Sequence, residues 1–401
     1  MTAQTNRRIV SFRAVAAFLF ATAFLAANCD PGLAARTNRA AAPIGLGKTL
    51  TTRDGGRIFG FDIDQNGDDG VLASAQTIDS DGNVLVSMET FDQNTGKITK
   101  SFAKYTGMRN EYGVDGIFAG DVALVTHYVT PKGSIYAKRT YEVMNPVTAR
   151  EFTGPWTPPL KDVDVLLAAE NQNAPTGVVF AIELKKQDKP VLIVSDIAAN
   201  TFSKVIRLDP DLFGLGNGPR LGQFTAANKA VLALSPDGGA VGGSPPLNVL
   251  VDLDTGATTQ FSGYNFGAYH AGYVNGLAVD PNSGIAATTT ELNSEVEFYD
   301  MGKKSRVAAV QLPCTDNTDQ INSGSNIAVD PLNKLFLVTD TFYCDGSEGS
   351  AIVVYDESGD FVEAITGFAF AIGEPAPAIN PAKRMGWAFG PAFSQLQQFF
   401  Y

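Results

Sequence analysis

Short apolar runs that lead into a polar turn recur in the second half of the chain. The run Leu277–Val279 is followed by Asp280 and a proline, and the run Ile327–Val329 is followed in the same way by Asp330. A third copy leads into Asn380, again with a proline after it, so the spacing is fifty residues. Apolar runs of this length, bounded by turn residues, predict buried β-strands. Their regular spacing predicts a structural repeat.

Each turn is followed by three further runs that resemble strands. The second run is alternating or β-branched, as in Leu335–Val338. The third run ends in an acidic residue, which is Asp252, Asp300 or Asp356 in three of the copies. A glycine-bearing turn and a solvent-facing fourth run come next, as in Phe361–Ile365. Four short strands in about 45 to 50 residues are typical of one blade of a β-propeller.

The repeat therefore predicts an all-β fold, a seven-bladed β-propeller that forms a single domain over residues 56–401. The last unit has room for only three strands, and Gly56–Ile63 is expected to supply the fourth, which closes the ring and leaves no open sheet edge. Residues 36–55 are then a flexible leader. Six or eight blades, or a β-sandwich, are the alternatives. The predicted units cover residues 68–104, 111–154, 162–209, 222–263, 271–313, 319–368 and 373–401.

The amino terminus has the order of charges and apolar residues found in secretory signal peptides. Arg7 and Arg8 precede the apolar run Ala14–Ala27, which is too short to favour a membrane span. Small residues predict cleavage after Ala35, and an earlier cut at the end of the apolar run is an alternative. A signal peptide over residues 1–35 predicts a secreted or periplasmic protein. The other reading is a lipoprotein anchored through Cys29.

Composition and charge exclude several classes of protein. The chain has 401 residues, of which 44% are hydrophobic and 18% charged, so it is not a disordered chain, a coiled coil or a collagen. Its formal net charge is −12, which argues against a nucleic-acid partner because phosphate binding requires a basic face. No later segment has the length of a membrane span.

Two cysteines remain after removal of the predicted signal peptide, Cys314 and Cys344. An oxidising compartment would allow them to form a disulfide, which would close a loop of about 30 residues and stabilise the fold by roughly 3 to 4 kcal/mol. Two free thiols are the alternative.

Polar residues cluster where the innermost strands are expected to begin. In a propeller these positions line the mouth of the central channel, where ligands and metals bind in many such folds. Calcium prefers oxygen ligands, so a metal at this mouth is one prediction. The alternative is that they are ordinary solvated loop residues. The residues are Asp68, Asp69, Asp162, Asp164, His270, Asn275, Asn326 and Glu374.

Asn275 and Asn326 each open a run that leads into a Val-Asp-Pro turn, and Asp340 closes the strand-like run after the second turn. These features resemble NHL-type and gluconolactonase-like β-propellers. In the lactone-hydrolysing family, Glu, Asn, Asn and Asp residues hold an axial metal. The resemblance implies a metal held by Asn275, Asn326 and Asp340. The Glu of the family's first blade has no clear counterpart in this sequence, and Glu374, from the polar residues of the mouth, is a further candidate axial ligand. It also implies that Asp340 handles the proton while the metal polarises the carbonyl of a lactone or related ester.

A second candidate metal site precedes the first predicted unit. Asp62, Asp64, Asn66 and Asp68 place oxygens at alternating positions, with Gly67 at the sixth place, as in the first half of a calcium loop. The twelfth position is an alanine rather than the bidentate acid of an EF-hand. The sequence leaves open a calcium-binding loop of another kind or a simple polar turn.

Only two histidines occur in the chain, and they limit the available chemistry. His127 lies in an apolar strand-like run and is read as an interior residue. His270 lies in an aromatic loop, where it is a candidate acid or base. The aromatic residues of that loop are a candidate binding face, with a core role as the alternative. They are Tyr264, Phe266, Tyr269 and Tyr273.

Taken together, these patterns predict a secreted, monomeric β-propeller that acts as a binding scaffold. Its ligand would be a small molecule, a glycan or a protein bound at the axial loop face, with calcium as a stabilising ion. The alternative function is a metal-dependent lactone or ester hydrolase.

Overall fold

The computed structural model divides the chain into two compact units, Met1–Ala41 and Ala42–Tyr401. All the described residues belong to the second unit. They are residues 44–78, 84–106, 110–119, 122–129, 138–144, 152–156, 159–160, 163–170, 176–183, 189–196, 199, 201–209, 220–225, 229–234, 247–262, 274–290, 293–312, 323–344, 347–368 and 376–401.

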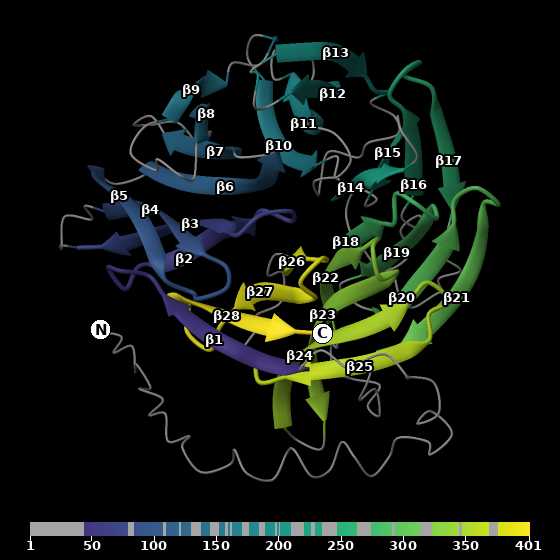
Figure 1. Ribbon diagram of the computed structural model, residues 1–401. Coiled ribbons are helices and arrows are strands. Elements are labelled where there is room, and N and C mark those ends of the chain that lie inside the picture. Colours follow the sequence, from purple (N-terminus) through teal and green to yellow (C-terminus); the bar gives the residue numbers. More distant parts are fainter. Residues whose placement is uncertain are drawn as a thin grey trace, which may run out of the picture. The chain divides into compact units, whose positions relative to one another are not determined.

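This part of the chain contains strands and no helix, and its strands form seven antiparallel sheets of four strands each (Figure 1). We number the sheets in chain order. Sheet 1 holds β2 (Arg57–Ile63), β3 (Asp69–Thr77), β4 (Val84–Asp92) and β5 (Ile98–Thr106). Sheet 2 holds β6 (Asn110–Ala119), β7 (Val122–Val129), β8 (Lys138–Met144) and β9 (Phe152–Trp156). Sheet 3 holds β10 (Val163–Glu170), β11 (Thr176–Glu183), β12 (Lys189–Asp196) and β13 (Thr201–Arg207).

The remaining sheets follow the same plan. Sheet 4 holds β14 (Arg220–Thr225), β15 (Lys229–Leu234), β16 (Leu247–Asp252) and β17 (Thr258–Ser262). Sheet 5 holds β18 (Val274–Val279), β19 (Ile285–Thr290), β20 (Asn293–Asp300) and β21 (Ser305–Gln311). Sheet 6 holds β22 (Ser323–Asp330), β23 (Leu335–Cys344), β24 (Ser347–Asp356) and β25 (Phe361–Thr366). Sheet 7 holds β26 (Ala378–Asn380), β27 (Met385–Phe389) and β28 (Gln395–Phe400), together with β1 (Gly45–Thr51).

The repeated Asp-Pro and Asn-Pro positions form the turn after the first strand of sheets 5, 6 and 7. Asp280 accepts a hydrogen bond at Oδ1 from the backbone nitrogen of Asn282 at 2.7 Å. Asp330 accepts one from the backbone nitrogen of Asn333 at 2.8 Å. A side chain that bonds the backbone two or three residues ahead fixes a tight turn. The predicted passage from apolar strand to polar turn is confirmed here.

The acidic residues at the ends of the third strands shape the next turn. Asp252 Oδ1 accepts hydrogen bonds from the backbone nitrogens of Asp254 and Thr255, each at 3.0 Å. The same turn contains Gly256 with a φ of 76°, and the corresponding position of sheet 5 is Lys304 with a φ of 54°. Glycine adopts this left-handed conformation without the steric cost that other residues incur, which explains the glycine-bearing turns of the repeat.

The strand that completes sheet 7 is β1, not the predicted segment Gly56–Ile63. β1 pairs antiparallel with β28, with Thr49 opposite Gln397 and Leu50 opposite Leu396. The segment proposed for this role forms β2, which pairs with β3 as the first strand of sheet 1. The predicted flexible leader over residues 36–55 is therefore wrong for Gly45–Thr51, which form a paired strand. Both segments have strand patterns, and both bury side chains in the core cluster of sheets 1, 6 and 7, Leu50 from β1 and Phe61 from β2. Burial therefore does not distinguish them, and only β1 pairs with β28.

The first strands of consecutive sheets contact one another in chain order. β2 contacts β6, β6 contacts β10, β10 contacts β14, β14 contacts β18, β18 contacts β22, and β22 contacts β26. β26 also contacts β2. Small four-stranded antiparallel meanders that meet through their first strands are the architecture of a β-propeller. The repeat in the sequence is thus a repeat of β-sheets.

The hydrophobic core lies between the faces of neighbouring sheets. One cluster joins sheets 5 and 6, where the rings of Phe298 and Phe336 meet edge to face at 5.5 Å between centroids. Another joins sheets 7 and 1, where Trp387 meets Phe91 at 5.3 Å. Strands that are buried on both faces account for the continuous apolar runs of the sequence. We call each such contact between consecutive sheets a seam.

Candidate functional site

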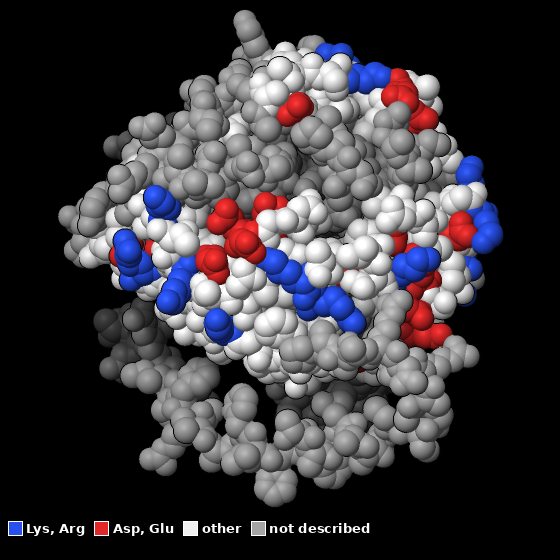
Figure 2. All heavy atoms as spheres, in the orientation of Figure 1, with Lys and Arg blue, Asp and Glu red and all other residues white. Residues whose placement is uncertain are grey.

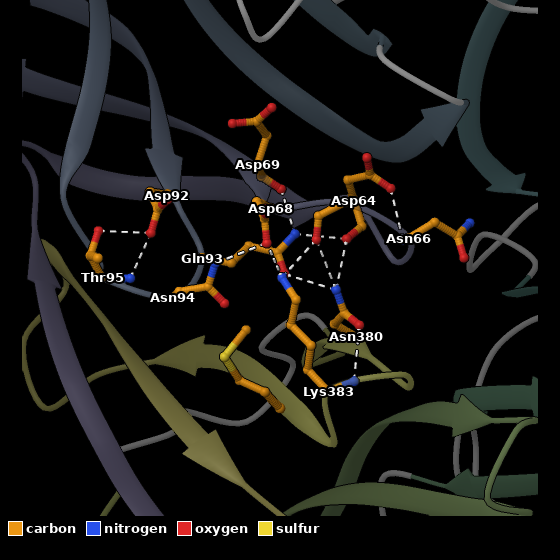
Figure 3. A network of polar contacts seen from close by, with 12 residues as sticks. Asp64, Asn66, Asp68, Asp69, Asp92, Gln93, Asn94, Thr95, Asn380 and Lys383 are labelled. Atoms are coloured by element: carbon orange, nitrogen blue, oxygen red, sulfur yellow. Dashed lines mark hydrogen bonds and ion pairs between the residues drawn. The ribbon is translucent and has the colours of Figure 1, made fainter.

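The seam between sheets 7 and 1 is held by two fully buried amides, Gln93 and Asn380 (Figure 3). Gln93 follows β4, and its Nε2 donates to the backbone oxygens of Asp64 at 2.7 Å and Asp69 at 2.6 Å. Asn380 Nδ2 donates to Gln93 Oε1 at 3.2 Å and to the backbone oxygen of Gly67 at 3.1 Å. Buried amides with this many partners fix the position of both sheets.

The side chains of the predicted calcium loop take part in this seam and in its turns. Asp64 Oδ1 accepts a hydrogen bond from the backbone nitrogen of Asn66 at 2.9 Å, and Asp62 Oδ1 accepts one from the backbone nitrogen of Ile63 at 2.8 Å. Asp68 Oδ1 accepts from Asn94 Nδ2 at 2.9 Å and forms an ion pair with Lys383 of sheet 7. The hydrogen bond from Lys383 holds the pKa of the Asp68 carboxyl below its usual value.

Side chains of three described inner turns reach the next sheet. Asn282 Nδ2 donates to the backbone oxygen of Pro331 at 3.3 Å, and Asn333 Nδ2 donates to that of Pro381 at 3.2 Å. At the following seam Lys383 Nζ donates to the backbone oxygen of Gly67 at 2.8 Å. The same kind of bond therefore links sheets 5 to 6, 6 to 7 and 7 to 1. Only the last of these three bonds uses a cation.

Figure 2 shows acidic side chains beside a row of basic ones on one face of the molecule. Among the described residues, Lys383 forms an ion pair with Asp68, and Lys303 Nζ lies 2.7 Å from Asp300 Oδ2. Each of these two lysines therefore has an acidic neighbour.

Asp340 is the predicted site residue with the most unusual environment. Its side chain is fully buried, and neither carboxyl oxygen has a hydrogen-bond partner among the residues that the structure describes. Phe336 and Val338 belong to the core between sheets 5 and 6, and alternate residues of a strand share a face. Asp340 therefore faces that seam too. Burial raises the pKa of its carboxyl to about 7.

The surroundings of Asp340 contain further residues of the predicted axial site. Asp340 lies opposite Gly324 at the start of β22, and Asn326 is two residues further along. A methyl group added at Gly276 of β18 would lie 2.8 Å from Thr289 Oγ1 and 2.9 Å from the Cα of Asn326. The inner strands that carry Asn275 and Asn326 therefore touch directly.

Thr289 Oγ1 of sheet 5 is also buried without a hydrogen-bond partner in the described part of the chain. Both it and the Asp340 carboxyl belong to the seam between sheets 5 and 6. The sequence pattern did not single out this threonine, since it occurs within a run of three threonines in β19. We call Asp340, Asn326 and Thr289 the inner-strand site, because they lie beside the inner strands β18 and β22. Asn326 is on β22 itself, whereas Asp340 and Thr289 are on the second strands β23 and β19.

Several predicted residues lie outside the described part of the chain. Asn275 is in β18 and Cys344 is in β23, but their side chains are not described. The aromatic loop, the second cysteine, the remaining axial acid and the predicted signal peptide also lie outside the described residues. These are Tyr264, Phe266, Tyr269, His270, Tyr273, Cys314, Glu374 and residues 1–35 with Cys29. The disulfide, the binding face and export stay predictions.

The described residues hold neither a candidate metal cluster nor a candidate membrane-spanning helix. They contain no group of three or more His, Cys, Asp or Glu side chains that could hold a metal ion. They also contain no helix with the length and hydrophobicity needed to cross a membrane.

Comparison with known proteins shows the fold and no family. No family model matches the sequence, and no curated protein matches it. Among solved structures, the chain is similar to Raptor of Chaetomium thermophilum, with a TM-score of 0.56 and 12% identity, over 89% of this chain. It covers only 29% of the length of that Raptor chain. At this identity the likeness concerns the fold alone.

Two further similarities have lower scores. The β-propeller domain of Cps50 (Swd1) from Myceliophteria thermophila matches with a TM-score of 0.49 and 11% identity. The match covers 90% of this chain and 100% of the Cps50 domain. The Dos1 propeller matches with a TM-score of 0.47 and 10% identity. The match covers 89% of this chain and 95% of the Dos1 chain.

Proposed function

We propose that the protein is a seven-bladed β-propeller whose ring is closed by β1 and that it acts as a binding scaffold. Two observations support closure. β26 contacts both β22 and β2, and the amides of Gln93 and Asn380 join sheets 7 and 1. A closed ring holds its seven sheets in fixed positions and leaves the loops between strands free to form a ligand site.

The ligand binds around the inner-strand site, at the end of the sheets where β18 and β22 begin. The observation that carries this proposal is the Asp340 carboxyl, which is buried without a partner. Burial of an ionised carboxylate without a partner costs several kcal/mol. A fold retains such a group at low cost when a ligand provides the missing partner. The ligand classes that fit are a small molecule, a glycan or a protein segment that presents a cation or hydrogen-bond donors.

Calcium fits the inner-strand site because it prefers oxygen ligands. Asp340 and Asn326 would hold it, together with the predicted ligands Asn275 and Glu374. A bound calcium ion would neutralise the buried carboxylate of Asp340 and fix β22 and β23 relative to each other. The residues themselves orient the site, since Thr339 Oγ1 donates to the backbone oxygen of Asn326 at 3.2 Å and thereby joins β23 to β22.

Thermal unfolding with calcium and with chelator tests this proposal. Calcium at about 100 times its dissociation constant is expected to stabilise the protein by about 2.7 kcal/mol, which corresponds to roughly 3 to 6 °C. The Asp340→Asn variant is expected to lose this response. In chelator it should be at least as stable as the wild type, because the substitution removes a carboxyl whose ionisation is opposed by burial.

Asp64→Asn is the matched control, because it removes one acid of the other candidate calcium loop and leaves the inner-strand site intact. It should keep the full calcium response. A response that is lost in the Asp64 variant and kept in the Asp340 variant would move calcium to the loop. A wild-type melting temperature that is the same in calcium and in chelator would refute calcium binding at either place.

A further inference from the structure

One pair of positions recurs at three seams. The residue that ends an inner strand, or directly follows it, faces the residue directly after the third strand of the next sheet. Between sheets 6 and 7 these residues are Asp330 and Tyr401, and the tyrosine hydroxyl donates to Asp330 Oδ2 at 3.0 Å. Between sheets 7 and 1 they are Asn380 and Gln93, and the asparagine amide donates to Gln93 Oε1 at 3.2 Å. Each pair combines a donor with an acceptor.

The corresponding positions between sheets 5 and 6 hold two acids, Asp280 and Glu357, whose carboxyl groups lie close enough to share a hydrogen bond. Asp280 is fully buried, and its Oδ1 accepts hydrogen bonds from the backbone nitrogens of Asn282 at 2.7 Å and Ser283 at 3.3 Å. Asp280 Oδ2 and Glu357 Oε1 are buried and have no donor within the described residues. Two ionised carboxylates cannot satisfy each other, so this seam lacks the hydrogen that the other two possess.

We propose that one proton shared by Asp280 and Glu357 acts as a latch between sheets 5 and 6. The proton completes the seam in mildly acidic solution, and its loss as the pH rises leaves two carboxylates that repel each other at the same place. The latch works independently of any ligand at the inner-strand site.

The charge environment of the pair supports a shared proton. Burial first, and then the contact with Glu357, raise the pKa of Asp280 to about 6, against the two backbone hydrogen bonds that lower it. On the side of sheet 6, Lys334 Nζ lies 3.4 Å from Glu357 Oε2, which is not the oxygen without a donor. The side chain of Lys334 is 67% exposed, so solvent screens its charge. No basic group contributes to the shift of Asp280.

The direction of the pH dependence follows from the raised pKa. The folded protein holds the Asp280 proton more tightly than the unfolded chain, so this contribution to stability is complete below the usual aspartate pKa of about 4. It is lost as the pH rises through about 6. A shift of about two pKa units corresponds to a rise of about 50-fold in the unfolding equilibrium constant between pH 4 and pH 7.5, because the aspartate of the unfolded chain is already about half ionised at pH 4.

Chemical unfolding of the full chain across this pH range tests the latch. Glu357→Gln places a permanent amide donor opposite the Asp280 carboxylate, and Asp280→Asn places one opposite Glu357. Relative to the wild type, Asp280→Asn is expected to lose the whole rise of about 50-fold in the unfolding constant between pH 4 and pH 7.5. Glu357→Gln is expected to lose a large part of it, because the Asp280 carboxyl stays buried but gains an amide donor. The measurement compares how the unfolding equilibrium constant changes with pH. A loss of stability that is the same at every pH therefore does not affect the result.

Asp360→Asn provides the matched control, because it removes an exposed acid from the same turn as Glu357. It should keep the wild-type slope. Amide hydrogen exchange at residues 280–285 localises the effect, and exchange there should accelerate at pH 7.5 in the wild type relative to Glu357→Gln. The latch is refuted when both amide variants keep the wild-type slope, or when the control loses it to the same extent.

Discussion

Replacing Gln93 with alanine is expected to lower the free energy of unfolding by about 3 to 5 kcal/mol. The side chain is fully buried and donates to the backbone oxygens of Asp64 and Asp69 while it accepts from Asn380. Truncation removes three buried hydrogen bonds, each of which contributes about 1 kcal/mol, and the cavity left by the side chain adds to the loss. Asn380 keeps its bond to the Gly67 oxygen, and the Asp69 oxygen keeps its bond from the Asp64 nitrogen. Equilibrium unfolding in urea measures the loss.

Gln395→Ala is the control for this substitution. The Gln395 side chain makes an exposed contact of 3.4 Å with Thr51 Oγ1, so its removal should cost less than about 0.5 kcal/mol. Equal losses in the two variants would mean that Gln93 has no special place in the seam between sheets 7 and 1.

Replacing Trp387 with alanine is expected to cost about 3 to 5 kcal/mol as well. The indole is fully buried, packs edge to face against Phe91, and donates from Nε1 to the backbone oxygen of Gln93 at 3.2 Å. It also lies against Gly96, where an added methyl group would be 2.9 Å from the ring. The alanine variant loses both the apolar contact and the hydrogen bond, so its unfolding midpoint should fall sharply in a denaturant titration.

Trp387→Phe separates the two contributions. Phenylalanine keeps much of the contact with Phe91 but cannot donate to Gln93, so the expected loss is about 1 to 2 kcal/mol. A phenylalanine variant as unstable as the alanine variant would contradict the idea that packing across this seam supplies most of the stabilisation.

The sequence predicted the features of the fold that depend on neighbouring residues. An apolar run followed by Asp280 or Asp330 carries its own turn signal, since the aspartate bonds the backbone two or three residues ahead. The acid at the end of the third strand is equally local, as Asp252 shows. These interactions lie within a few residues of each other, so a pattern in the sequence records them directly.

The sequence did not predict which strand completes sheet 7. Both β1 and β2 have strand patterns, and the choice depends on contacts such as that of Thr49 Oγ1 with Gln397 Oε1 at 2.7 Å, across 348 positions of the chain. No local pattern records a partner at that distance. The sequence pattern therefore predicts Gly56–Ile63, the segment nearer to the first repeat, as the fourth strand of sheet 7.

The candidate site shows the same limit. The alternating oxygens of Asp64 and Asp68 predict a calcium loop, and this stays a prediction. The sequence does not record that Lys383, from the far end of the chain, forms an ion pair with Asp68. The lack of a partner at Asp340 also depends on residues from other strands, and an aspartate at the end of an apolar run does not reveal it. Residue types identified the candidates, but only the fold shows which of them lack a partner.

Cross-linking of β1 to β28 tests ring closure most directly. Thr49 and Gln397 are opposite each other and their side chains touch, so a Thr49→Cys, Gln397→Cys variant meets the distance requirement of a disulfide. A control variant pairs Thr49→Cys with Ser305→Cys of sheet 5. After mild oxidation of the folded protein, peptide mapping should find the 49–397 disulfide and no 49–305 disulfide. Failure of the 49–397 bond to form while the protein remains folded, or equal formation of both bonds, would contradict a ring closed by β1.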